Sequence, residues 1–254
     1  MIPDHFTAPH QRREGEAPAA PAGSRIYAIG DVHGRADLLR EMHRLIHADA
    51  YRRQAPRNVV VYLGDYIDRG RQSPEVLDIL LNEALPSFES IYLKGNHEES
   101  LLRFLDDISI GPAWLYYGGA ETLESYGVTT PQSPHEPRAL TRAQRELQRH
   151  LPDSHRNFMA SLRLLHAEGD YLFVHAGIRP GVPLQQQDPE DLLWIRDSFL
   201  DSDAEHGCIV VHGHTITERP DVQRNRIGID TGAFASDRLT CLILEGTDWS
   251  FLQT

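Results

Sequence analysis

Hydrophobic residues in the first third of the chain fall into two alternating kinds of segment. The first kind is a short continuous apolar run, which has the length of a buried strand: Ile26–Ile29, Asn58–Leu63 and Ser90–Lys94. The second kind has apolar residues three and four positions apart, as in a helix: Ala36–Ala50, Ser73–Leu85 and the stretch from Glu98 onward. This β-α-β-α-β-α order predicts a layered α/β fold.

The pattern changes beyond these segments. Residues 106–155 are helical in patches interrupted by prolines, and two interpretations stay open: a lid or specificity insert, or a plain connecting helical layer. Strand-like runs then return and predict a second sheet packed on the first: Tyr171–Val174, Cys208–His212, Arg226–Asp230 and Leu239–Leu244. The proline-containing residues 1–24 predict a disordered tail, which leaves residues 25–254 as a single domain.

Composition narrows the function classes. The net charge of −12 gives an overall field that repels nucleic acid and anionic membranes, so neither is an expected partner. No apolar run approaches the roughly 20 residues that span a bilayer. The two cysteines, Cys208 and Cys241, indicate no disulfide framework and favour a cytoplasmic location. Because Lys94 is the only lysine, a bound phosphate must be neutralised by arginine or metal.

Three glycine-flanked polar turns follow the first three predicted strands. They read Gly30-Asp31-Val32-His33-Gly34, Gly64-Asp65-Tyr66-Ile67-Asp68-Arg69-Gly70 and Gly95-Asn96-His97-Glu98. Ligand crevices of α/β sheets lie at the carboxyl ends of strands, so these turns should converge. Helix capping by Asp or Asn would explain one such turn, but not three with complementary ligands.

The polar side chains of these turns are metal ligands in type. Asp31 and Asp65 offer carboxylates, His33 an imidazole and Asn96 an amide oxygen. Two later histidines fit the same set: His175 ends one predicted strand, and His214 follows another. His212 is an alternative to His214. Oxygen and nitrogen donors without thiolate favour a catalytic manganese, iron or zinc site over a structural zinc site.

The motifs resemble the phosphoprotein phosphatase branch of the metallophosphoesterases, whose pattern is GDxHG, GDxxDRG, GNHE and two separate histidines. The elements occur here in that order between Ile26 and Gly232. The resemblance implies a calcineurin-like fold, a four-layer α/β/β/α sandwich of two mixed sheets flanked by helices. Within this branch, the sequence is similar in particular to the compact bacterial Ser/Thr-type phosphatases.

The resemblance also implies roles for individual residues. Asp31, His33 and Asp65 would hold one divalent ion, and Asp65, Asn96, His175 and His214 the other, with manganese expected first. His97 would be the general acid, oriented by Asp68. Arg69 and Arg196 would clamp the phosphate, although the match at Arg196 is looser. A hydroxide bridging two ions would then attack phosphorus in line.

We therefore expect a metal-dependent phosphomonoesterase that acts on phosphorylated protein or peptide and on small phosphoesters. A symmetrical dinucleoside tetraphosphate hydrolase shares the same loops and is the main alternative. Trp114, Tyr116 and Tyr117 keep it open, because a base could stack on them. A catalytically silent binding module is a further alternative, against which the complete ligand set argues.

Overall fold

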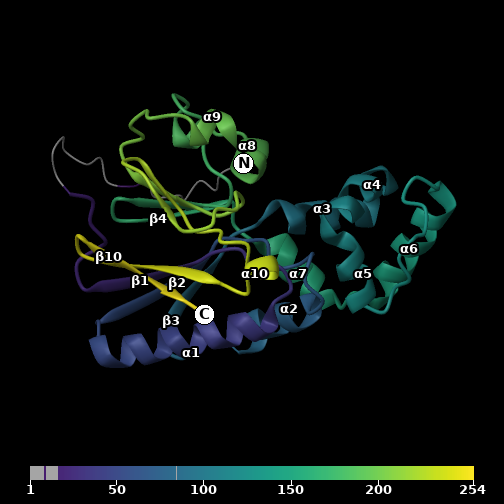
Figure 1. Ribbon diagram of the computed structural model, residues 1–254, viewed down its shortest axis with the longest axis horizontal. Helices are drawn as coiled ribbons and strands as arrows, with labels where there is room; N and C mark the ends of the chain where they lie inside the picture. The colour runs from purple at the N-terminus through teal and green to yellow at the C-terminus, as the bar shows by residue number, and fades with distance from the viewer. Residues whose placement is uncertain (1–8, 10–16, 84) are drawn as a thin grey trace.

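Two five-stranded mixed sheets lie face to face, with helices on the outer side of each (Figure 1). The computed structural model describes residues 9, 17–83 and 85–254. A lobe of helices α3 to α7 extends to one side of the sandwich, on the right in Figure 1. This is the α/β/β/α arrangement that the motifs implied.

The first sheet has the order β10-β9-β1-β2-β3. Its strands are β1 (Ser24–Ile29), β2 (Arg57–Tyr62), β3 (Phe88–Tyr92), β9 (Thr240–Glu245) and β10 (Asp248–Gln253). The first three are parallel, whereas β9 is antiparallel to both β1 and β10. The carboxyl ends of β1, β2 and β3 therefore meet at one edge of the sheet.

The second sheet has the order β4-β5-β6-β8-β7. Its strands are β4 (Leu165–Glu168), β5 (Tyr171–Val174), β6 (Ile209–His212), β7 (Asp221–Val222) and β8 (Arg226–Gly228). Strands β5, β6 and β8 are parallel, and the two edge strands are antiparallel to their neighbours.

The helices connect the strands and form the outer layers. The α-helices are α1 (Ala36–Arg53), α2 (Ser73–Asn82), α3 (Asn96–Asp106), α4 (Gly111–Trp114), α5 (Ala120–Ser125), α6 (Pro137–His150), α7 (Asp153–Ser161), α8 (Pro189–Trp194), α9 (Asp197–Leu200) and α10 (Ala233–Ser236). Short turns of other helix types are η1 (Ile108–Ile110), η2 (Leu115–Gly119) and η3 (Leu184–Gln186), of which η2 is a π-helix.

Strand periodicity assigns the side chains to three hydrophobic layers. In β1, Tyr27 and Ile29 face the helices, and Ile26 and Ala28 face the second sheet. In β5, Leu172 and Val174 pack outward against helices α8 and α9, while Tyr171 and Phe173 join the layer between the sheets. Alternate residues of a strand point to opposite faces, so a strand buried on both sides reads as a continuous apolar run.

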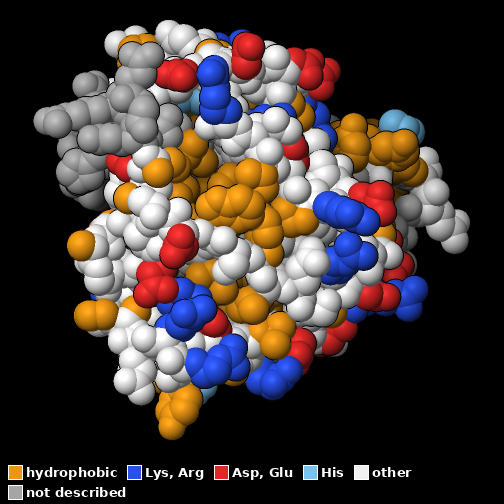
Figure 2. All heavy atoms as spheres, turned by 60° about the vertical axis from the view of Figure 1, so that its left-hand side comes forward, with side chains coloured by type: hydrophobic (Ala, Val, Ile, Leu, Met, Phe, Trp, Pro, Cys, Tyr) orange, Lys and Arg blue, Asp and Glu red, His pale blue; other side chains and the backbone are white. Residues whose placement is uncertain are grey.

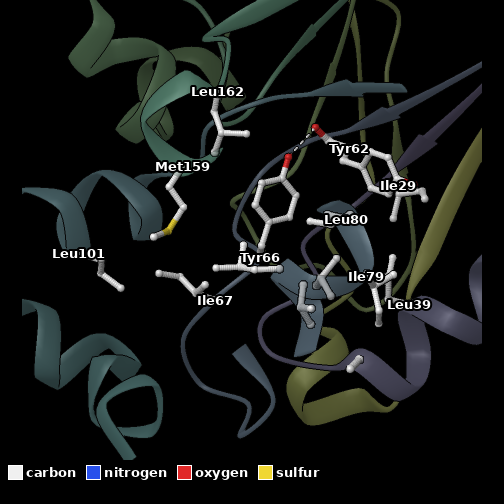
Figure 3. Packing of buried hydrophobic residues seen from close by; sticks show 14 of the residues in the cluster. Ile29, Leu39, Tyr62, Tyr66, Ile67, Ile79, Leu80, Leu101, Met159 and Leu162 are labelled. Atoms are coloured by element: carbon white, nitrogen blue, oxygen red, sulfur yellow. Dashed lines mark hydrogen bonds between the residues drawn. The ribbon is translucent and has the colours of Figure 1, made fainter. Parts of the chain in front are cut away.

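One core residue connects the edge at the carboxyl ends of β1, β2 and β3 to the helical layer. Tyr66 leaves the loop after β2, and its ring lies among Leu80, Met159 and Leu162 (Figure 3). Its hydroxyl donates to the carbonyl oxygens of Leu93 at 2.7 Å and Tyr62 at 3.4 Å. Full burial of a side chain of this size contributes roughly 2–3 kcal/mol, which holds the neighbouring Asp65 in place.

The N-terminal prediction needs a correction. Residues 17–24 are part of the fold, because Ala20 N donates to Gly246 O at 2.8 Å, Ala19 N donates to the Asp170 carboxylate at 2.9 Å, and β1 already begins at Ser24. These backbone groups find partners in distant segments, which composition cannot reveal. The remainder of the predicted tail, residues 1–8 and 10–16, lies outside the described residues.

Several further expectations can be compared with the fold. All seven predicted strands are present, β5 with the predicted bounds and the other six with shifted ends, whereas β4, β7 and β10 were not predicted. Cys208 and Cys241 are both buried. Within the described chain, no helix has both the length and the apolar character that crossing a bilayer requires. On the face in Figure 2, acidic and basic side chains are mixed around a hydrophobic patch.

Candidate active site

The polar turns after the parallel strands converge, and their backbones are strained. Five of the eight non-glycine residues with positive φ in the described chain lie here: His33, Asp65, Asp68, Arg69 and His214. Such conformations cost of order 1–3 kcal/mol each and persist only where surrounding contacts over-determine them. The strain is concentrated at the residues that the sequence assigned to chemistry.

Asp65 lies at the centre of the converging turns, with histidine nitrogens on two sides. His33 Nε2 is 3.5 Å from Asp65 Oδ2, and His175 Nε2 is 3.4 Å from Asp65 Oδ1. In both rings Nδ1 faces a backbone carbonyl, Ile67 O at 2.8 Å or Leu63 O at 2.9 Å. A carbonyl only accepts, so Nδ1 carries the proton and Nε2 directs a lone pair at the carboxylate.

Asn96 forms the other side of this cluster. Its Oδ1 lies 2.9 Å from His175 Nε2 and 2.8 Å from His214 Nδ1. The side chains therefore form two overlapping sets of close donor atoms, His33-Asp65-His97 and Asp65-His175-His214. Asp65 belongs to both sets, which is the position of a bridging ligand.

Burial keeps the imidazoles neutral. It lowers the pKa values of His33 and His175 below the ordinary range, and that of His214 to about 2. Neutral imidazole lone pairs and carboxylate oxygens would repel one another at these separations unless a cation lay between them. The donor set therefore fits divalent metal, and its mixture of oxygen and nitrogen suits a catalytic rather than a structural ion.

Asp31 also lies at this centre, on its first-sheet side. Its Oδ2 accepts from His214 N at 3.0 Å, whereas Oδ1 is buried without a partner among the described residues. A Cβ on Gly213 would collide with Oδ1, so only glycine allows this close approach. Burial raises the pKa of Asp31, and Asp230 and Asp65 raise it further. A cation would relieve this crowding of buried carboxylates.

His97 and Asp68 form a buried pair beside the cluster. His97 Nδ1 lies 2.7 Å from Asp68 Oδ2, and His97 Nε2 faces inward, 3.8 Å from Asp65 Oδ2. Burial alone would lower the pKa of His97, but Asp65 and Asp68 outweigh it and raise the pKa. The carboxylate at Nδ1 fixes the ring orientation and favours the charged form, which can give up the proton on Nε2.

Two arginines border the centre, as the sequence predicted. Arg69 Nη1 lies 3.0 Å from His33 Nε2, and its guanidinium stacks over the Phe234 ring at 4.9 Å. Arg196 is exposed at the start of α9, and its Nη2 donates to His214 O at 3.5 Å. Both can present a planar fork of donors to a phosphate.

Two supporting residues were not predicted. Glu98 accepts hydrogen bonds from the backbone N–H groups of Asp65, Tyr66, Ile67 and Gly95, at 2.8–3.3 Å. It thereby fixes two of the three turns to each other. Asp230 binds Gly232 N at 2.9 Å, and burial raises its pKa to about 6. Glu98 stands inside the third polar turn and Asp230 at the end of a predicted strand, and these positions were the available signal.

The segment 106–155 contacts the site directly. Trp114 Nε1 donates to Asp68 Oδ2 at 2.8 Å, and Thr122 Oγ1 donates to Asp68 Oδ1 at 2.6 Å. Trp114 is buried, whereas Tyr116 and Tyr117 are exposed and border a cavity of about 540 Å³. The segment is therefore more than a plain connecting layer, because two of its side chains hold a residue of the centre.

His212 and His214 take different positions although they are two residues apart. His212 ends β6, where its ring packs 5.3 Å from Phe199 and its Nδ1 lies 3.1 Å from Gly213 O. His214 instead faces Asn96. This geometry places His214, rather than His212, among the candidate ligands.

The layered fold, the paired donor sets and the adjoining acid and arginines define a metallophosphoesterase. The chain belongs to the calcineurin-like phosphoesterase family, whose family model matches residues 24–241.

The relatives name more than one activity. Serine/threonine-protein phosphatase 2 of Escherichia coli (strain K12) is 36% identical over 95 residues, 37% of this chain and 38% of that protein. The match therefore spans less than half of that relative. The asymmetrical bis(5'-nucleosyl)-tetraphosphatase PrpE of Bacillus thuringiensis (strain Al Hakam) is 24% identical over 236 residues, 84% of this chain and 88% of that protein.

Solved structures support the fold. A putative diadenosine tetraphosphatase has a TM-score of 0.62 at 17% identity, covering 94% of this chain and 98% of its own. A cold-active protein tyrosine phosphatase mutant has a TM-score of 0.55 at 18% identity, covering 91% and 79%.

Proposed function

We propose that the protein is a metal-dependent phosphomonoesterase of the Ser/Thr protein phosphatase type. The observation that carries this proposal is the His97-Asp68 pair, with Nε2 of His97 turned toward the two donor sets around Asp65. An acid in this position suits the departure of an alkoxide, which is a poor leaving group without a proton.

The donor sets would hold two divalent ions, which supply an activated water and neutralise phosphoryl charge. Manganese is our first expectation. The chain's own residues perform the remaining tasks. Arg69 and Arg196 bind phosphate oxygens. Asp68 accepts from His97 Nδ1–H and so stabilises the imidazolium, whose other proton, on Nε2, is the one given to the leaving group.

The charge around the centre favours a single phosphate group as substrate. Among the described residues, the arginines that contact the centre are Arg69 and Arg196. The nearby cavity is lined by Tyr116, Tyr117, prolines and other uncharged side chains, with His135 as its one titratable exception apart from the tyrosines. A tetraphosphate would bring several more negative charges, for which these lining residues offer no cation.

Dinucleoside tetraphosphate hydrolysis is a second candidate, because two observations favour it. The PrpE relative matches over 84% of this chain. Tyr116 and Tyr117 are also exposed at a cavity of the helical lobe, so that a base could stack on either ring, and Tyr117 O accepts from Arg69 Nε at 3.4 Å.

The test compares initial rates on a phosphothreonine peptide, p-nitrophenyl phosphate and diadenosine tetraphosphate. Each is measured after chelation and again with added Mn²⁺. We expect metal-dependent release of phosphate from the first two and little reaction of the third. Preferential cleavage of the dinucleotide would replace our proposal with the second candidate. No turnover by folded, metal-loaded protein would overturn both.

A further inference from the structure

The carboxylate of Asp68 is held from outside by two side chains of the helical lobe. Trp114 donates to Oδ2 at 2.8 Å, and Thr122 donates to Oδ1 at 2.6 Å. Thr122 Oγ1 also accepts from Asp68 N at 2.9 Å. Trp114 and Thr122 are almost inaccessible to solvent, so water cannot replace these bonds readily.

His97 shares that carboxylate. Its Nδ1 lies 2.7 Å from Oδ2, the oxygen that Trp114 also binds. With donors on both oxygens, the carboxylate cannot rotate without breaking a buried hydrogen bond. Asp68 itself has a φ of 71°, a strained conformation that needs such fixed surroundings.

The same segment also fixes the backbone of Arg69. Arg69 N donates to Gly118 O at 3.0 Å, and Arg69 Nε donates to Tyr117 O at 3.4 Å. These carbonyls belong to the π-helical turn η2. This conformation is rare in proteins overall, and where it occurs it is often at a functional site. Gly118 has a φ of 114°, and a Cβ there would lie 2.7 Å from Arg69 N, so this contact requires glycine.

We propose that Trp114 and Thr122 are positioning residues for the proton donor. They fix the Asp68 carboxylate, which in turn holds His97 with Nε2 directed at the leaving group. This inference rests on the proposed function, because it assumes that His97 protonates an alkoxide. It gives the helical lobe a part in the chemical step.

The experiment uses Trp114→Phe and Thr122→Val in the full chain, loaded with Mn²⁺. Trp114→Phe removes one donor and keeps an aromatic ring, and Thr122→Val removes the hydroxyl at nearly constant volume. We expect kcat on a phosphothreonine peptide to fall roughly tenfold in each, as loss of about one hydrogen bond's free energy implies. On p-nitrophenyl phosphate, whose leaving group needs little protonation, we expect less than about a threefold loss.

Matched controls separate positioning from general damage. Thr122→Ser keeps the hydroxyl and should restore most of the activity on the peptide. Trp249→Phe and Thr141→Val make the same chemical changes at residues outside the site, half-exposed and partly buried respectively, and should leave both rates unchanged. Circular dichroism melting identifies any variant that fails to fold. If Trp114→Phe fails, the Thr122→Val and Thr122→Ser pair decides.

A double variant supplies the most specific outcome. In a His97→Asn background, Trp114→Phe and Thr122→Val should cause little further loss on the peptide, because the residue they position is gone. A full additional tenfold loss, or equal losses on peptide and aryl substrate in the single variants, would overturn the inference. Failure of the proposed function looks different, since wild-type protein would then lack the phosphatase activity altogether.

Discussion

The strand-end turns and the segment Gly111–Tyr126 contribute to the same centre in different ways. The turns carry Asp31, Asp65 and Asn96 next to glycines that allow the backbone to turn tightly. A short sequence motif therefore reveals them. The segment contributes Trp114 and Thr122 across 46 and 54 residues of sequence to Asp68. The candidate ligands are thus local in sequence, whereas the orientation of Asp68 depends on tertiary packing.

The largest expected effect concerns the turns, through Asp65→Asn. Asp65 belongs to both donor sets, so the substitution should impair both ions at once. We expect kcat/KM on p-nitrophenyl phosphate to fall by more than roughly 100-fold. Roughly 100-fold is the largest loss typical of residues that only support a metal ligand, and a ligand itself should cost more. Steady-state kinetics with excess Mn²⁺ measures this, and Asp203→Asn is the exposed control. Wild-type activity in Asp65→Asn would exclude a bridging role.

The next effect distinguishes the acid from the ligands, through His97→Asn. We expect a roughly 100- to 10,000-fold loss on a phosphothreonine peptide, the usual contribution of general acid catalysis. The loss on an aryl phosphate should be much smaller. The ratio of the two rates is the measurement. A ratio unchanged from wild type would contradict the general-acid assignment and make His97 a candidate ligand, since it also belongs to a donor set.

The histidine pair after β6 gives a smaller, internally controlled effect. His214→Asn should lower kcat/KM at least roughly tenfold at limiting Mn²⁺, because it removes an inner donor. His212→Asn, two residues away, should change the rate less than about threefold, since His212 packs on Phe199 instead. A Mn²⁺ titration of activity compares the two. The reverse order of losses would make His212 the ligand.

The smallest expected effect on catalysis concerns the scaffold of the helical lobe. Leu147 is fully buried on α6, which also donates from Gln148 Nε2 to Leu105 O on α3 at 2.7 Å. Leu147→Ala should lower the free energy of unfolding by about 2–5 kcal/mol. Activity well below the melting temperature should change little. Urea denaturation measures the first, and an unchanged midpoint would show that α6 packing contributes little.

Much of the fold was readable because the strands are buried on both faces. Continuous apolar runs predicted β1, β2 and β5 and placed the polar turns at their ends. Strand β7 has two residues, and β10 has four exposed positions among six, so neither gives a clear pattern. Their pairing with β8 and β9 becomes evident only in three dimensions.

The candidate ligands could be identified from the sequence, whereas the residues that contact them from distant segments could not. Every ligand candidate came from a motif or from a histidine at a strand end. Trp114 was singled out only as an aromatic on which a base could stack, because its partner Asp68 is 46 positions away. Phe234 likewise had no predicted role, yet its ring lies beneath the Arg69 guanidinium. Contacts of this kind depend on how loops meet, which local sequence does not encode.

The most direct test of the central claim is the number of Mn²⁺ ions that each chain binds. Metal-free protein is titrated by isothermal calorimetry, and the bound metal is counted by elemental analysis after desalting. We expect two ions per wild-type chain, and fewer than two with reduced affinity in Asp65→Asn, because that carboxylate serves both donor sets. A folded wild-type chain that reaches full phosphatase activity with one ion, or with none, would contradict the account.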